Sequence, residues 1–136
     1  MPTSGFEEIR HTADWALRVR GSDLADLCRQ AALGMLHLAG ARPGQDRFEP
    51  RAIEIEAPDG ETLLVRWLEE LLYDLEIRQV VPVAMNLQTE GETRLKGTLT
   101  EAPLADMSKV IKAVTFNNLQ ITGTPEGVES TIVFDV

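Results

Sequence analysis

The chain has 136 residues, 43% of them hydrophobic and 26% charged, so it is long enough to bury a core as a single domain over residues 1–136. Its 22 acidic and 13 basic residues give a net charge of −9, which argues against direct nucleic-acid binding because lysine and arginine supply most of that affinity. The single cysteine, Cys28, argues against a secreted fold built on disulfides, and no apolar run is long enough for a membrane span. We therefore expect a cytoplasmic protein.

The first half of the chain alternates between strand and helix patterns. Residues 14–20 alternate apolar and polar side chains, as in a half-buried strand, and residues 23–39 repeat apolar side chains at helical spacing. A loop at 41–50 leads to a second alternating run at 52–57. A broad apolar stripe then predicts a second helix over about 60–75, with Asp59 able to cap it.

The second half of the chain indicates strands. Glu90-Gly91-Glu92 is typical of a hairpin turn, and Ala102-Pro103 predicts a break. The strands are expected near residues 82–89, 93–100, 110–116, 117–122 and 128–136. This order predicts an α+β fold in two layers, with two amphipathic helices packed on one face of a mainly antiparallel sheet.

The last strand carries the strongest candidate site. Alternation places Asp135 on the face opposite Phe134, and it places Asp14 opposite Trp15 in the same way. If these strands are antiparallel neighbours, both carboxylates converge beside the terminal carboxylate of Val136. Three such groups repel one another unless they are solvated, take up protons or bind a cation. Their oxygen ligands suit Ca²⁺, with Mg²⁺ or Mn²⁺ as alternatives; a solvated acidic cluster is the competing interpretation.

Two further residues of the first half are candidates for a functional role. His11 can act as a base or a ligand, or it can be a hydrogen-bonded structural residue at a strand start. Glu70 lies on the polar edge of the second helix, where it is either solvated or able to reach a partner.

Other polar residues have plainer interpretations. Lys112 is expected on one strand face with Val110 and Val114. Such a lysine either forms a structural ion pair with an acidic side chain or has a functional role. Cys28 lies on an apolar helix stripe and is expected in the core. Nucleotide-binding and hydrolase motifs such as GxGxxG, GxxxxGK[ST], GxSxG and HExxH are missing from the sequence, which argues against an enzyme that works alone.

Four stretches together resemble the archease family, in the family's order. They are HTADWALRVRGSDLADLCRQAALGM, LLVRWLEELLY, VIKAVTFNNLQI and the terminal VFDV. The resemblance implies a non-catalytic activator of the RtcB-type RNA ligase of tRNA splicing and RNA repair, which uses GTP and Mn²⁺. It further implies a divalent metal bound by Asp14, Asp135 and Val136.

The resemblance also implies secondary residues and points to departures from the family pattern. His11, Glu70 and Lys112 match family segments and are candidates for ligase contact or activation. Relatives carry a Tyr-His pair where this chain has Phe116-Asn117, and a His-containing segment where it has PLADMSKV, so the activating surface can differ. A general chaperone or assembly factor, for instance for RNA methyltransferases, stays the alternative. A metal-dependent hydrolase is disfavoured, and the sequence specifies no oligomeric state.

Overall fold

The structure, a computed structural model, describes residues 4–10 and 15–136. In chain order its elements are β1 (Gly5–Arg10), β2 (Trp15–Gly21), α1 (Leu24–Ala39), β3 (Arg42–Pro43), β4 (Glu49–Glu56), α2 (Gly60–Tyr73), the π-helical turn η1 (Asp74–Arg78), β5 (Val80–Glu90), β6 (Arg94–Asp106), β7 (Ala113–Thr115), β8 (Thr122–Thr124) and β9 (Gly127–Asp135).

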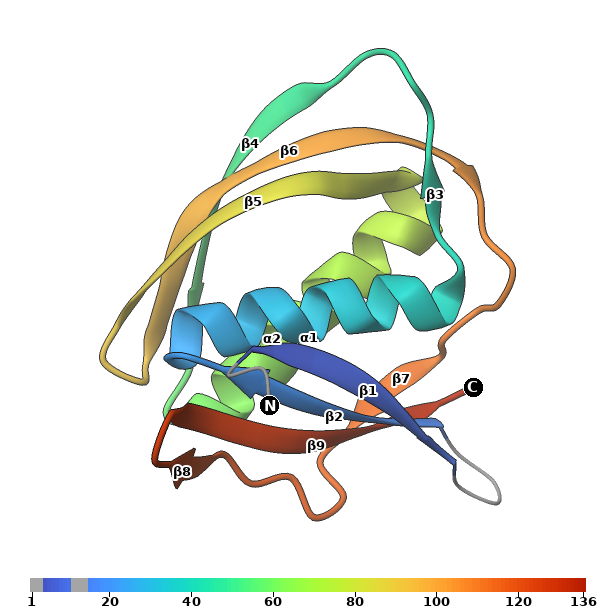
Figure 1. Cartoon of the computed structure of the whole chain (residues 1–136). Helices are drawn as coiled ribbons and strands as arrows, with labels where there is room; N and C mark the ends of the chain where they lie inside the picture. Colours follow the sequence, from blue (N-terminus) through green and yellow to red (C-terminus); the bar gives the residue numbers. More distant parts are fainter. Residues whose placement is uncertain (1–3, 11–14) are drawn as a thin grey trace.

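The strands form two antiparallel sheets. The first has the order β1-β2-β9-β7 with β8 also paired to β9, and the second has the order β3-β6-β4 with β5 paired to β6. Figure 1 shows α1 and α2 between the two sheets. The predicted α+β class, with two helices packed against mainly antiparallel strands, is confirmed; that the strands divide into two sheets is an addition to the prediction. Within the described residues, neither helix combines the length and the apolar character needed to cross a bilayer.

Both helices begin where the sequence predicts. The Asp23 carboxylate accepts a hydrogen bond from the Asp26 N–H at 2.8 Å, and Asp59 caps α2 by accepting from the Thr62 N–H at 2.7 Å. At the other end of α1, Gly40 takes a left-handed φ of 62°, a conformation that costs glycine little. Local capping therefore sets where each helix begins and where α1 ends.

The core lies between the helices and both sheets. It includes the fully buried side chains of Leu17, Met35, Trp67, Leu99 and Phe134. The indole N–H of Trp67 donates to the Cys28 carbonyl at 2.8 Å and so ties α2 to α1. Burial raises the pKa of the Cys28 thiol to about 12, which confirms Cys28 as a core residue rather than a reactive thiolate.

The strand boundaries differ from prediction at several places. The predicted strand at 117–122 is wrong: residues 117–121 are not strand, and β8 begins only at Thr122 because backbone pairing with β9 covers Thr122–Thr124 alone. The predicted loop at 41–50 contains the short strand β3, which pairs with β6. The segment around Phe6 forms β1 on the edge of β2, where its two exposed glutamates hide the strand pattern. The β5–β6 hairpin is confirmed, but β6 continues through Pro103 because Pro103 lies opposite Val80, at the end of the pairing with β5. Residues 110–112 are not strand; β7 covers only Ala113–Thr115, after a segment whose Ser108 and Lys109 N–H groups both donate to the Ala39 carbonyl.

Candidate functional site

The ends of β2 and β9 lie side by side. The two strands are antiparallel, with Trp15 opposite Phe134, so the adjacency assumed for the metal prediction is confirmed for these strands. On the other side of β9, Asp135 pairs with Ala113 of β7, and its carbonyl accepts a hydrogen bond from the Lys112 N–H at 2.8 Å. The Asp135 backbone is therefore held within the sheet while its side chain is exposed.

Two of the three predicted metal ligands lie within the described residues. They are Asp135, which is exposed, and Val136, which is half-buried beside it. Asp14 and His11 lie outside the described residues, so the trio stays a prediction. Among the described residues, no three His, Cys, Asp or Glu side chains converge in a way that would hold a metal ion. The exposed Asp135 carboxylate makes no ion pair with any described residue and is an oxygen ligand of the kind that hard cations take.

Basic side chains come from the segment between β6 and β7. The ammonium of Lys109 lies 3.4 Å from the centroid of the Trp15 ring, a cation–π contact at the start of β2. Lys112 is exposed and joined to Asp135 through its backbone. The prediction that Lys112 shares a strand face with Val110 and Val114 is wrong: Val114 is buried, Val110 is exposed, and both Val110 and Lys112 precede β7. The shortness of the strand is the reason, because alternation extends only over paired residues.

Glu70 belongs to a different cluster, which joins α2 and η1 to the second sheet. Arg51 of β4 pairs with Glu70, and its Nη1 lies 2.5 Å from Asp74 Oδ2 and 3.4 Å from Glu101 Oε2. Arg78 of η1 lies 3.1 Å from both Asp74 and Glu101. We call these five side chains the ionic network. Glu70 is therefore engaged within the protein.

The interior of the ionic network is acidic. Asp74 is fully buried and Glu101 is 5% exposed, whereas both arginines reach solvent. Burial raises the pKa of the Asp74 carboxyl, although its bonds to Arg78 and Arg51 oppose the shift. Hydrogen bonds to Glu101 and Asp74 raise the pKa of Arg78. Three carboxylates against two guanidiniums leave one net negative charge at this place.

Sequence reasoning missed four members of the ionic network. Arg51 shares its strand face with Ile53 and Ile55, and Glu101 shares its face with Leu95 and Leu99. A charged side chain in phase with an apolar strand face is the signal that could have found them, because such a charge needs a partner when buried. Which charges pair could be decided only by the packing of α2 and η1 against the second sheet.

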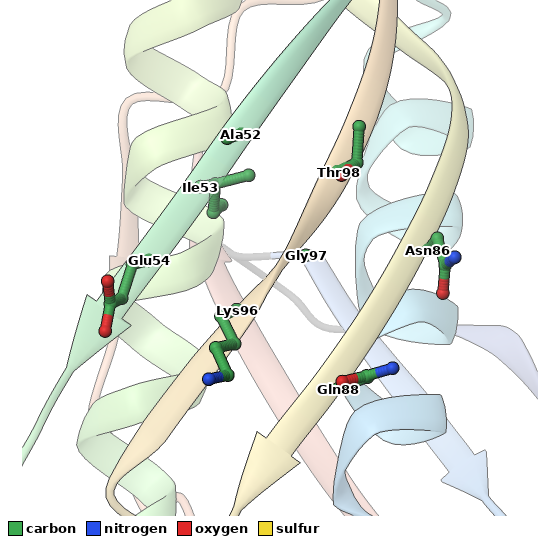
Figure 2. A pocket seen from close by; sticks show the side chains of 8 residues that line it. All are labelled: Ala52, Ile53, Glu54, Asn86, Gln88, Lys96, Gly97 and Thr98. Atoms are coloured by element: carbon green, nitrogen blue, oxygen red, sulfur yellow. The ribbon is translucent and has the colours of Figure 1, made fainter.

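A shallow cavity lies on the face of β4, β6 and β5 that points away from the helices. Its volume is about 470 Å³, and Figure 2 shows the strands that line it in front of the helices. Cross-strand neighbours Glu54 and Lys96 lie at one end with Gln88, and Thr98 lies opposite Asn86. No predicted site residue lines this cavity.

The chain belongs to the archease family. The sequence profile of the Archease protein family matches residues 6–136, nearly the whole chain. Protein archease of Methanosarcina acetivorans is 32% identical over 146 residues that cover 100% of both chains. Protein archease of Archaeoglobus fulgidus is 33% identical over 135 residues, which cover 96% of this chain and 98% of that protein.

Solved structures share the fold. The crystal structure of an archease from Thermotoga maritima, described there as a possible chaperone, superposes with a TM-score of 0.72 at 21% identity and covers 96% of each chain. The solution structure of protein 1598 from Methanobacterium thermoautotrophicum gives a TM-score of 0.71 at 26% identity, with 97% of this chain and 99% of that chain covered. The resemblance found in the sequence is thereby confirmed at the level of the family and of the fold.

Proposed function

We propose that this archease binds a divalent cation through Asp14, Asp135 and Val136, and that it activates an RtcB-type RNA ligase without being an enzyme itself. The observation that supports the cation site is the register of β2 and β9, in which Trp15 lies opposite Phe134. Asp14 directly precedes Trp15 in sequence, and Asp135 directly follows Phe134. Ca²⁺ is the expected ion, with Mg²⁺ and Mn²⁺ as alternatives.

The residues around Asp135 hold the end of β9 in place, as a metal site there requires. Backbone pairing with Ala113 and the bond from Lys112 hold the strand end in place, so the exposed carboxylate is presented from a rigid element. A divalent cation held there would supply positive charge for the phosphate groups of a nucleotide. The net charge of −9 favours a protein partner over direct RNA contact.

Calorimetric titration with calcium chloride tests the cation site. We expect Asp14→Ala and Asp135→Ala each to abolish binding, while Glu126→Ala leaves it unchanged. Glu126 is the matched control because it is an exposed carboxylate in the turn just before β9. Unaltered calcium affinity in both Asp variants would exclude the site.

The ligase activity is tested by mixing the purified protein with its cognate ligase and GTP. We expect faster transfer of GMP to the ligase and more turnovers, and we expect Asp135→Ala to lose this effect. Guanylylation kinetics that are the same with and without the protein would contradict the proposal. The chaperone alternative, which the description of the Thermotoga maritima protein supports, then predicts less aggregation of client proteins with no effect on the chemistry of the ligase.

A further inference from the structure

One edge of the second sheet is a long strand that has a partner on one side only. Along Arg94–Glu101, β6 pairs with β4 on one side and with β5 on the other, and Figure 2 shows β6 between them. Among the described residues, β5 pairs with β6 alone. Every second residue of β5 therefore directs its backbone N–H and C=O away from the sheet, where a further strand can pair with them.

The other outer strands carry features that oppose such pairing. β4 has Pro50 and four charged residues among its eight, and β1 has Glu7 and Glu8 at its centre. β3, β7 and β8 have only two or three residues each. Charged side chains, proline and short length are the means by which natural sheets avoid pairing edge to edge.

β5 lacks these features over most of its length. It has 11 residues, and its only charged side chain is Glu90, at its end. Pro82 and the register shift between Pro82 and Ala84 disturb only its start. The rest, Ala84–Thr89, contains no charged residue, proline or glycine, a composition that favours pairing between strands of different chains. The free edge of β5 therefore fits an occupant that is itself an extended strand.

The side chains of Ala84–Thr89 alternate between the two faces of the sheet. Met85 and Leu87 are half-buried and pack against the core, whereas Asn86 and Gln88 are exposed and line the shallow cavity of Figure 2. A strand added at this edge has to continue both faces, with apolar side chains on the core side and uncharged side chains on the outer side. A second copy of β5 has this pattern.

A two-fold axis through Asn86 pairs two copies of β5 without a mismatch. The two strands are then antiparallel, so Asn86 lies opposite its own copy, Met85 lies opposite Leu87, and Ala84 lies opposite Gln88. Apolar side chains meet on the core side, and no like charges are opposed. This register joins the second sheets of two molecules into one continuous antiparallel sheet.

We propose that the free edge of β5 is a dimerisation edge, at which a second copy of this chain adds its own β5 in this antiparallel register. The dimer depends neither on the cation site nor on the ligase, because Asp135 lies on a strand of the first sheet. The net charge of −9 on each chain opposes association. Dimerisation should therefore strengthen as salt screens this repulsion, whereas a contact between opposite charges would weaken.

Sedimentation velocity over a range of protein and salt concentrations tests the dimer. We expect the wild-type mass to rise with concentration from 15.0 kDa towards twice that value. Asn86→Lys places two ammonium groups opposite each other at the axis, and we expect it to weaken the dimer at least about threefold. The matched control is Ala52→Lys, which adds the same charge to the same face at the β4 end of the row that Ala52 forms with Thr98 and Asn86. It should dimerise like the wild type, and circular dichroism establishes that both variants are folded.

Disulfide formation tests the register. Directly opposite residues of antiparallel strands have Cα atoms about 4.5–5.5 Å apart, which is within the range of a disulfide. The two copies of Gln88 would lie four residues apart along the strands, about 13 Å, which is beyond that range. We therefore expect Asn86→Cys to crosslink under mild oxidation at least about tenfold faster than Gln88→Cys, its matched control on the same face. Cys28 is buried and does not compete.

Weaker dimerisation of Asn86→Lys but not of Ala52→Lys, together with preferential crosslinking of Asn86→Cys, supports the dimerisation edge. A wild-type mass of 15.0 kDa at every concentration and salt overturns it. Equal crosslinking of the two cysteine variants, or a wild-type dimer in Asn86→Lys, also overturns it. A monomer whose activation of the ligase is lost in Asn86→Lys alone overturns the dimer as well and assigns the edge to a strand of the ligase, while the proposed function stands.

Discussion

Replacing Asp74 with alanine should be among the most damaging single changes to this protein. Asp74 is fully buried at the junction of α2 and η1, and its two oxygens contact Arg51 at 2.5 Å and Arg78 at 3.1 Å. Alanine removes the carboxylate that both guanidiniums share. Arg51 keeps two further acidic contacts, with Glu70 and Glu101, and Arg78 keeps one, with Glu101.

The size of the effect follows from these contacts. Breaking a buried ion pair by removing one partner costs about 3–5 kcal/mol, because the remaining charge is left uncompensated. Here the side chains of Arg51 and Arg78 are 26% and 39% exposed, so water screens part of the loss. The burial that raises the Asp74 pKa also makes the carboxylate itself costly, which offsets another part. We therefore expect the free energy of unfolding to fall by about 2–4 kcal/mol, equivalent to a lower Tm by roughly 8–16 °C for a domain of this length.

Urea denaturation followed by circular dichroism measures this change. The matched control is Glu76→Ala, which removes an exposed acidic side chain from the same turn and should cost less than about 0.5 kcal/mol. If Asp74→Ala loses no more stability than this control, the ionic network does not hold η1 to the second sheet and the reasoning is refuted.

Three smaller predictions concern the core and the second sheet. The Cys28 thiol, with its pKa raised to about 12 by burial, should stay neutral and resist a disulfide reagent at mildly alkaline pH until denaturant is added; fast labelling of the native protein would contradict its burial. Trp67→Phe should lower the unfolding free energy by about 1–3 kcal/mol, since the Cys28 carbonyl loses its indole donor, and an unchanged urea midpoint would argue against that bond. Gly97→Ala should cost about 1–3 kcal/mol in the same assay, because a Cβ at residue 97 would lie 2.0 Å from the Asn86 carbonyl oxygen; wild-type stability would show that β5 and β6 can separate.

The sequence alone determined the features that depend on local spacing. Helical periodicity and the capping residues Asp23 and Asp59 located both helices, and alternation located β2 and the long hairpin of β5 and β6. Alternation also placed Asp135 away from the core residue Phe134, and the pairing of β2 with β9 agrees with the convergence that the metal prediction requires. Periodicity predicts these features because the spacing of apolar residues within one segment shows which face of that helix or strand is buried.

Only the tertiary structure decided what depends on residues far apart in the chain. The division of the strands into two sheets, the edge strand β1 and the shortness of β7 follow from backbone pairing that no local pattern encodes. The ionic network is the clearest case, because Arg51, Asp74 and Glu101 are separated by more than twenty residues from one another and meet only when α2 packs on the second sheet. A buried charge is tolerated only when its ion-pair partner is in place. The partners of these charges can therefore be identified only from the packing of the helical segment on the sheet.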